Sequence, residues 1–261
     1  MFSEAEAYER FMGRWSARLA PLFVKFAGNR DGDAVLDVGS GTGALTLHVA
    51  DVAPSSRITG VDPSADYVDF AQKRVLTNRV NFEVGDAQRL RFSDSTFDRT
   101  FALLMMNFIP DRTKALREMI RVTRPDGFVA AAVWDYGEGM EMLRIFWDEA
   151  VAQDPAITAR DERHMPLSRN GELEAFWREN GLLNVVGQPL TVQLDFSSFD
   201  DFWTPFLAGQ GPAGSHVASA SAEQRVELRD RLRRRVLGDS TDRPITLQAR
   251  AWAVKGVVPP H

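Results

Sequence analysis

The sequence predicts an α/β fold with a mostly parallel sheet and helices on both of its faces. In the first half of the chain, short apolar runs typical of buried strands alternate with segments of helical periodicity. The run at residues 35–38 is followed at once by three glycines, Gly39, Gly41 and Gly43, and then by a helical segment. A tight turn of this kind typically joins the first strand of a parallel sheet to its helix.

The expected elements follow in order along the chain. Residues 5–27 carry apolar side chains at helical spacing and are expected to form a pair of amphipathic helices. Ser64 and Asp111 precede two further helical patterns and are predicted to cap those helices. Each predicted strand is a short apolar or alternating run. The strands are expected over residues 35–38, 58–62, 80–84 and 128–134.

The second half of the chain lacks this regular alternation. A helix is expected over residues 140–153, followed by an irregular segment over 154–170 that holds two prolines and many charges. A short helix that ends at Gly181 comes next. Two long runs, 185–196 and 245–254, then predict a pair of strands.

Residues 197–240 lie between these two strands and are too many for a hairpin loop. The segment begins with aromatic residues and continues with a glycine-rich stretch, residues 209–214, that is expected to be flexible. It ends in a helix for which Ser221 and Gln224 form a capping box and Gly238 forms the terminus.

This last helix is expected to bury one face against the rest of the molecule. The residues predicted on that face are Val226, Leu232 and Val236. We interpret residues 197–240 as a lid over a substrate pocket. The remaining residues, 1–196 and 241–261, are expected to form the core domain.

Composition narrows the classes of partner. The formal net charge of −5 offers nucleic acid no overall electrostatic attraction. The absence of cysteine excludes disulfides, thiolate metal sites and a cysteine nucleophile, and no metal site is expected. No run approaches the roughly 20 apolar residues of a membrane span, and the acidic N-terminus does not resemble a signal peptide. We therefore expect a cytoplasmic protein; its oligomeric state is not indicated.

The glycine turn predicts a nucleotide-type ligand. Glycines let backbone N–H groups approach a ligand closely, and the start of the following helix favours an anionic group. Asp62 ends the second strand, where its carboxylate can accept both hydroxyls of a ribose. Asp86 follows the third strand, where it can accept a hydrogen bond from an adenine amino group.

Two kinds of nucleotide cofactor fit part of this pattern. Gly39, Gly41 and Ala44 also satisfy the dinucleotide fingerprint G-x-G-x-x-G/A, so an NAD(P)-dependent oxidoreductase is an alternative. That fingerprint does not require Asp86. None of the three tyrosines has a lysine four residues later, which weakens the short-chain dehydrogenase interpretation.

In the order and spacing of these segments, the chain resembles the class I S-adenosylmethionine-dependent methyltransferases of the small-molecule type, including those acting on quinone precursors. The resemblance covers residues 35–134. It is carried by the glycine turn, by Asp62, by Gly85-Asp86-Ala87, by the loop at residues 106–111 and by the turn at residues 124–128.

The resemblance implies a Rossmann-like three-layer sandwich. Its seven-stranded sheet would be mostly parallel with one antiparallel strand, and the last two strands would pair as an antiparallel hairpin. The helices at residues 5–27 would cover the cofactor, S-adenosylmethionine, and a helical lid would complete the pocket. Arg14 would pair with the methionyl carboxylate of the cofactor. The other implied cofactor-binding residues are Gly39, Ser40, Gly41, Asp62, Pro63, Asp86, Ala87 and Leu103.

The implied reaction is transfer of the cofactor's methyl group to an O, N or C atom of a small molecule, with release of S-adenosylhomocysteine. Positioning dominates such a reaction, and the sequence indicates no catalytic residue beyond His216 as a candidate base. Trp134, Trp203 and Phe206 are candidates for stacking on an aromatic or apolar acceptor. Asp37 is expected to bond the backbone of the glycine turn. A non-catalytic S-adenosylmethionine-binding protein remains a further alternative.

Overall fold

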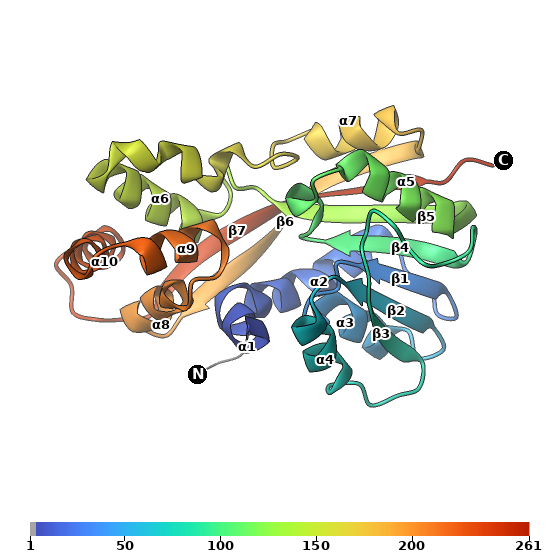
Figure 1. Cartoon of the computed structure of the whole chain (residues 1–261), viewed down its shortest axis with the longest axis horizontal. Coiled ribbons are helices and arrows are strands. Elements are labelled where there is room, and N and C mark those ends of the chain that lie inside the picture. Colours follow the sequence, from blue (N-terminus) through green and yellow to red (C-terminus); the bar gives the residue numbers. More distant parts are fainter. Residues whose placement is uncertain (1–3, 261) are drawn as a thin grey trace.

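The computed structural model describes residues 4–260, which form a single seven-stranded sheet with helices on both faces (Figure 1). The strand order is β3-β2-β1-β4-β5-β7-β6. All neighbours are parallel except β7, which is antiparallel to both β5 and β6. The strands are β1 (Ala34–Val38), β2 (Arg57–Asp62), β3 (Val80–Val84), β4 (Phe97–Leu103), β5 (Thr123–Trp134), β6 (Leu183–Phe196) and β7 (Ile245–Val257). The predicted fold class, with one antiparallel strand and a terminal hairpin, is confirmed.

Apolar side chains alternate between two cores, one on each side of the sheet. Along β1, Val35 points into a core shared with α2 (Arg14–Ala27) and α3 (Ala44–Val52). The next residue, Leu36, points into a second core built with α5 (Arg112–Val122) and α7 (Glu172–Glu179). A parallel sheet that is buried on both faces in this way explains the nearly continuous apolar runs of its central strands.

The predicted helix caps form. Ser64 Oγ accepts a hydrogen bond from Tyr67 N–H at the start of α4 (Ala65–Gln72). Asp111 accepts one from Lys114 N–H, 2.9 Å away, at the start of α5. Each cap satisfies a backbone donor that has no partner within its helix, so the helix starts where the capping residue stands.

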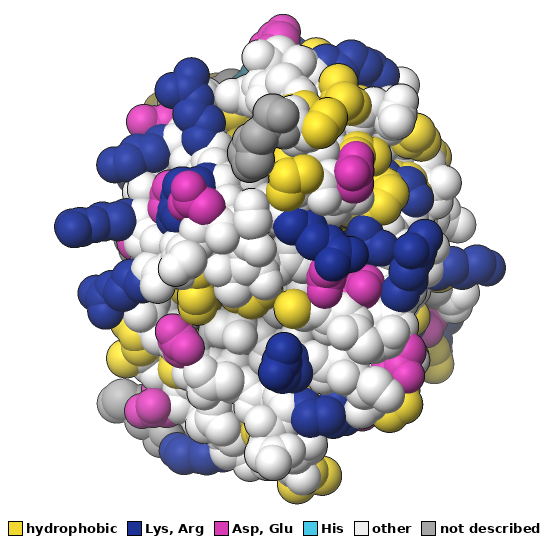
Figure 2. All heavy atoms as spheres, turned by 90° about the vertical axis from the view of Figure 1, so that its right-hand side faces the viewer, with side chains coloured by type: hydrophobic (Ala, Val, Ile, Leu, Met, Phe, Trp, Pro, Cys, Tyr) yellow, Lys and Arg dark blue, Asp and Glu magenta, His cyan; other side chains and the backbone are white. Residues whose placement is uncertain are grey.

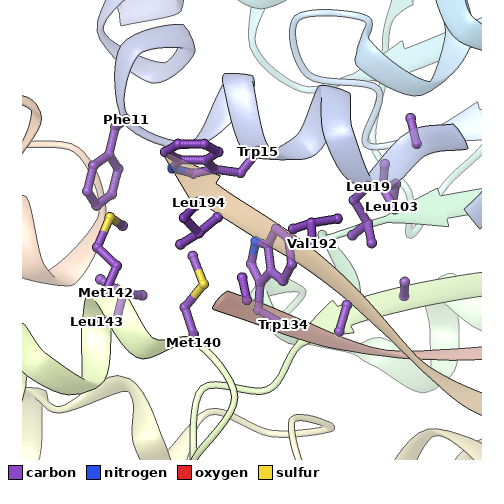
Figure 3. Packing of buried hydrophobic residues seen from close by; sticks show 14 of the residues in the cluster. Phe11, Trp15, Leu19, Leu103, Trp134, Met140, Met142, Leu143, Val192 and Leu194 are labelled. Carbon is purple, nitrogen blue, oxygen red and sulfur yellow. The ribbon is translucent and has the colours of Figure 1, made fainter. Parts of the chain in front are cut away.

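The N-terminal residues form a continuous helical segment rather than two separate helices. It consists of α1 (Glu4–Tyr8), a π-helical turn η1 (Glu9–Gly13) and α2. Trp15 and Leu19 of α2 are fully or almost fully buried. In Figure 3 they point towards Leu194 and Val192 of β6. The helix α2 is therefore packed against the edge strand of the sheet.

Beyond β5 the chain forms α6 (Glu141–Gln153), as expected. The predicted irregular segment contains two 3₁₀ turns, η3 (Pro155–Arg160) and η4 (Glu162–His164). This segment leads to α7 and then to the long hairpin of β6 and β7.

The insertion between β6 and β7 is helical throughout most of its length. It comprises α8 (Phe199–Trp203), the 3₁₀ turn η5 (Thr204–Ala208), α9 (Gly211–Ser219) and α10 (Ala222–Leu237). The capping box of Ser221 and Gln224 is confirmed, and Gly238 ends α10.

Two expectations for the insertion are wrong. The glycine-rich stretch at residues 209–214 is not a flexible loop, because α9 begins at Gly211 and carries Pro212 in its first turn, a position where proline's missing N–H is not needed. Val226 does not lie on the buried face of α10 and is 60% exposed. The buried residues of that helix are Leu228, Leu232 and Leu237.

Aromatic rings join the insertion to the N-terminal segment and to α6. The ring of Phe206 stacks on that of Phe146, with centroids 4.6 Å apart and 14° between the planes. The rings of Phe206 and Phe11 pack edge to face, with centroids 5.3 Å apart. Phe206 is fully buried, so this contact closes the space between three segments that are distant in sequence.

The surface carries both signs of charge. On the face shown in Figure 2, the Lys and Arg side chains are accompanied by Asp and Glu and separated by uncharged surface. Among residues 4–260, no helix combines the length and the apolar character needed to cross a membrane.

Replacing Phe206 by alanine is expected to lower the free energy of unfolding by about 3–5 kcal/mol, because it removes a buried aromatic ring and leaves a cavity. Urea denaturation followed by tryptophan fluorescence measures the change. The neighbouring Leu207 is 49% exposed, and Leu207→Ala should change the free energy of unfolding by less than about 1 kcal/mol. Equal losses in the two variants would contradict the assigned packing.

Candidate functional site

A cavity of about 200 Å³ lies at the carboxyl ends of the parallel strands, beside the glycine turn. Its walls come from the N-terminal helical segment, the tips of β1, β2, β4 and β5, the η4 turn and the start of α9. Residues that line it include Tyr8, Phe11, Asp62, Leu103, Trp134 and Glu162. The fold therefore brings together at one edge of the sheet residues from most of the length of the chain.

The glycine turn forms one wall of this cavity. Gly39 has φ of 72°, in the left-handed region that other residues rarely adopt. A Cβ atom added at Gly39 would lie 2.6 Å from Cγ of Met105, in the loop after β4. The backbone N–H groups of Gly39 and Ser40 both donate to the carbonyl of Val61, at 2.7 and 3.0 Å. Glycine is thus required at 39 for both conformation and space.

Asp62 at the tip of β2 holds the turn in place. One carboxylate oxygen accepts from Gly41 N–H and the other from Ser64 N–H, both at 2.9 Å. The side chain is 7% exposed and lines the cavity. Burial raises the pKa of Asp62, although the hydrogen bonds from Ser64 and Gly41 act in the opposite direction. The residue predicted to bind ribose therefore faces the cavity from beside the glycine turn.

Asp37 has a different partner from the one expected. Its carboxylate accepts a hydrogen bond from Thr46 Oγ1 of α3 at 2.6 Å. Within the described residues, its other oxygen has no hydrogen-bond partner, so the predicted bond to the backbone of the turn is wrong. Because Asp37 lies inside β1, its side chain points at α3 rather than along the strand to the turn. Burial raises the pKa of Asp37 to about 7.

The N-terminal segment lies over the glycine turn. Tyr8 lines the cavity and also a smaller one on the Asp37 side of the turn. Its ring lies 5.4 Å from that of Tyr67, and its hydroxyl is 3.3 Å from Ser16 Oγ. The carboxylate of Glu9 accepts a hydrogen bond from the hydroxyl of Thr42 in the turn itself.

Arg14 is not among the residues that line this cavity, and its pairing with a ligand carboxylate stays a prediction. Its guanidinium forms an ion pair with Asp201 of the insertion, 2.8 Å away. It also lies over the rings of Trp15 and Phe196, 4.2 and 4.8 Å from their centroids. Through the carboxylate of Asp201 and the ring of Phe196, Arg14 links the N-terminal helix to the insertion and to β6, although its buried Nε has no hydrogen-bond partner among the described residues.

The remaining predicted cofactor-binding residues differ in whether they line a cavity at the turn. Leu103 lines both cavities, and Ser40 lines the smaller one. Pro63 is exposed directly after Asp62, and Ala87 is buried beyond β3. Asp86 is exposed, and its carboxylate accepts from Gln88 N–H at 2.8 Å. The assignment of Asp86 to adenine stays a prediction.

His216 lies in α9 and faces a second cavity rather than the one at the glycine turn. Its ring packs near Phe146 and Trp147, with centroids 6.2 and 5.9 Å apart. Burial, together with the charge of Arg160, lowers its pKa. Of the three candidate stacking residues, Trp134 lines the glycine-turn cavity, whereas Trp203 and Phe206 are buried in the core.

Sequence reasoning missed three polar residues of the cavity, Tyr67, Tyr136 and Glu162. Glu162 is 6% exposed and accepts a hydrogen bond from Trp147 Nε1 at 2.8 Å. Burial raises its pKa to about 7. It lies in the segment interpreted only as irregular, where no motif distinguishes it from the neighbouring charged residues.

Asp37→Asn is expected to gain stability relative to the wild type as the pH rises from about 4 to about 7.5. In the folded wild type the pKa is raised to about 7, whereas unfolding returns it to its ordinary value of about 3.9. The unfolded state therefore ionises first, and wild-type stability falls through this window by about 3 kcal/mol, while the amide does not titrate. Urea denaturation at both pH values tests this, with exposed Asp239→Asn as the control. A stability difference between wild type and Asp37→Asn that is the same at both pH values would refute the assignment.

Comparison with known proteins matches part of this chain to methyltransferases. Residues 35–127 match a protein family described as a methyltransferase domain. The chain is 34% identical over 117 residues to the ubiquinone/menaquinone biosynthesis C-methyltransferase of Geotalea daltonii, a match that covers 43% of this chain and 48% of that protein. It is 36% identical over 131 residues to the 27-O-demethylrifamycin SV methyltransferase of Amycolatopsis mediterranei, covering 49% and 46%.

The whole fold also has relatives among solved structures. Phosphoethanolamine N-methyltransferase 2 of Haemonchus contortus superposes with a TM-score of 0.61 at 19% identity, over 98% of this chain and 57% of that one. The two sequence matches span less than half the length of each relative. The family match over residues 35–127 includes the glycine turn and the strands β2 and β4. Residues 35–127 of this chain therefore match a methyltransferase domain family and are similar to named methyltransferases over less than half of the chain.

Proposed function

We propose that this protein transfers the methyl group of S-adenosylmethionine to a small-molecule acceptor and releases S-adenosylhomocysteine. The observation that carries the proposal is the buried carboxylate of Asp62, which faces the same cavity as the glycine turn. Each oxygen of this carboxylate accepts one backbone hydrogen bond and can accept another, which the two hydroxyls of a ribose would supply.

The residues present fit this cofactor. Asp62 would hold the ribose, and the backbone of Gly39, Ser40 and Gly41 would meet the methionyl part. Leu103 would flank the cofactor from the tip of β4. The adenine would extend towards Pro63 and towards Asp86-Ala87, which follow the tips of β2 and β3. When bound, the cofactor supplies an electrophilic methyl group on a positively charged sulfur.

The task left to the protein is to align the acceptor and to exclude water. Positioning of this kind can contribute roughly 7–11 kcal/mol to lowering a barrier. The insertion serves this purpose as a lid, since Gln210, Gly211 and Pro212 line the cavity. The cavity of about 200 Å³ is smaller than the roughly 300–1,000 Å³ of ligand sites, so the lid or the N-terminal segment moves to admit cofactor and acceptor.

The acceptor is a small aromatic or apolar molecule. Phe11, Phe108 and Trp134 line the cavity and offer flat apolar surfaces to a ring. The names of the two sequence relatives refer to a carbon and to an oxygen acceptor, so they leave the methylated atom open.

Calorimetric titration with S-adenosylmethionine, S-adenosylhomocysteine and NADH tests the proposal. Binding of the two sulfur compounds without NADH supports it, whereas binding of NADH alone would point to the oxidoreductase alternative. Transfer of labelled methyl to any acceptor separates an enzyme from a non-catalytic binding protein.

Asp62→Asn is expected to weaken S-adenosylmethionine binding by about 10–100-fold, because charged hydrogen bonds of roughly 1.5–3 kcal/mol to the ribose are lost. Isothermal titration calorimetry measures the affinity. Asp69→Asn changes an exposed carboxylate on the adjacent helix α4 and should leave it unaltered. An unchanged affinity in Asp62→Asn would remove the ribose assignment.

A further inference from the structure

Glu162 forms part of the wall of the cavity at the glycine turn. It is the first residue of η4, and it also lines the second cavity, which contains His216. Its side chain is 6% exposed. Asp62 is the other carboxylate among the described residues that line the glycine-turn cavity, and the proposed function assigns it to the ribose. Glu162 is therefore the carboxylate of this cavity that is left for the acceptor.

The Glu162 carboxylate is held firmly but is not neutralised. Trp147, which is fully buried, donates its indole N–H to Oε2 at 2.8 Å. Arg144, whose charge acts on Glu162, and the adjacent Arg163 both form ion pairs with Asp161 at 2.6 Å. Within residues 4–260, Glu162 itself has no ion-pair partner within 4.0 Å. A carboxylate fixed in this way has a free oxygen that can accept a proton from a bound molecule.

The surroundings of Glu162 raise its pKa, so the carboxyl group gains and loses its proton near neutral pH. Burial is the largest influence on its pKa, which lies at about 7; Asp161 raises it further, while the Trp147 bond and the charge of Arg144 lower it. The negative charge of Glu162 in turn contributes to the raised pKa of Tyr136, so the two side chains are close. The other titratable groups of the two cavities that Glu162 lines are Tyr8, Asp62, Tyr67, Arg160, His164 and His216.

We propose that Glu162 is the general base of the reaction and that the acceptor carries an aromatic hydroxyl group; this inference rests on the proposed function. During methyl transfer, the acceptor oxygen would bond to the methyl carbon. The carbon–sulfur bond would break and leave its electron pair on sulfur. The hydroxyl proton passes to the Glu162 carboxylate. The sulfonium charge is thereby cancelled, and the released proton leaves the site through Glu162.

The chemistry of the cavity favours an aromatic hydroxyl over the alternatives. A base that ionises near neutral pH matches a phenol far better than an aliphatic alcohol, whose proton is much less acidic. The apolar side chains of Phe11, Phe108 and Trp134 suit an aromatic ring. The acceptor would lie between Glu162 and the glycine turn, which line the same cavity.

The test combines cofactor binding with turnover on defined probes. Wild type, Glu162→Gln, Glu162→Asp and the control Glu179→Gln are compared. Glu179 ends α7, is exposed and lies outside the residues that line the cavity. The probes are phenol, catechol and 1-naphthol, with 1-naphthylamine as the amine counterpart. Methyl-labelled S-adenosylmethionine reports transfer, and calorimetry reports its binding.

Glu162→Gln keeps an acceptor for the indole N–H of Trp147 but cannot take a proton. We expect kcat/KM for the hydroxyl probes to fall roughly 10²–10⁴-fold with S-adenosylmethionine affinity unchanged. Glu162→Asp restores part of the rate, and Glu179→Gln behaves as the wild type. The wild-type rate rises with pH as the carboxylate loses its proton near pH 7, and Glu162→Gln lacks that rise.

Three results would overturn the inference: a Glu162→Gln rate equal to that of the wild type, methylation of the amine alone, or no methylation of any hydroxyl probe by a wild type that binds S-adenosylmethionine. Failure of the wild type to bind S-adenosylmethionine would instead refute the proposed function. Chemical denaturation of Glu162→Gln establishes that a lost rate is not lost folding, and Glu162→Asp provides the second variant.

Discussion

The hydrogen bond between the N–H of Gly41 and the carboxylate of Asp62, 2.9 Å long, is the contact on which the site depends. It fastens the turn after β1 to the tip of β2, and the bonds from Gly39 and Ser40 to Val61 complete the attachment. With the turn fixed, the absence of a side chain at Gly39 lets Met105 approach from β4. Three strand tips thereby meet at one cavity. The same carboxylate is buried and partly desolvated, which leaves it with unmet hydrogen-bonding capacity towards a ligand.

Elements governed by local chemistry were predictable from the sequence. The caps at Ser64 and Asp111 and the capping box at Ser221 formed as expected, since each depends on residues within one turn of helix. The antiparallel strand and the terminal hairpin were implied by the family resemblance and not by periodicity. Tertiary partners were not predictable in this way. Arg14 pairs with Asp201, which lies 187 residues further along the chain, and the burial of Leu228 rather than Val226 follows from where α10 packs.

The closeness of Gly39 and Asp62 could be predicted, because parallel strands place their carboxyl ends at the same edge of the sheet. Glu162 could not. Its environment is created by α6, by the glycine turn and by the insertion, and within its own segment it is one acid among several charged residues. Its chemistry arises from desolvation, which a sequence pattern does not record. His216 differs from Glu162 in the opposite way. Histidine is a common general base and was therefore a candidate from the sequence, but the fold places it at a separate cavity.

The long hairpin of β6 and β7 has a consequence for how this architecture diversifies. Phe196 and Ile245 are paired partners in the sheet, so the two ends of the intervening segment are clamped side by side whatever lies between them. Loop-closure entropy grows only slowly with length, so the paired ends can hold segments of different length between them. Because Gln210, Gly211 and Pro212 belong to this segment, a different segment would give the cavity a different wall. The wall formed by the glycine turn and Asp62 would stay as it is.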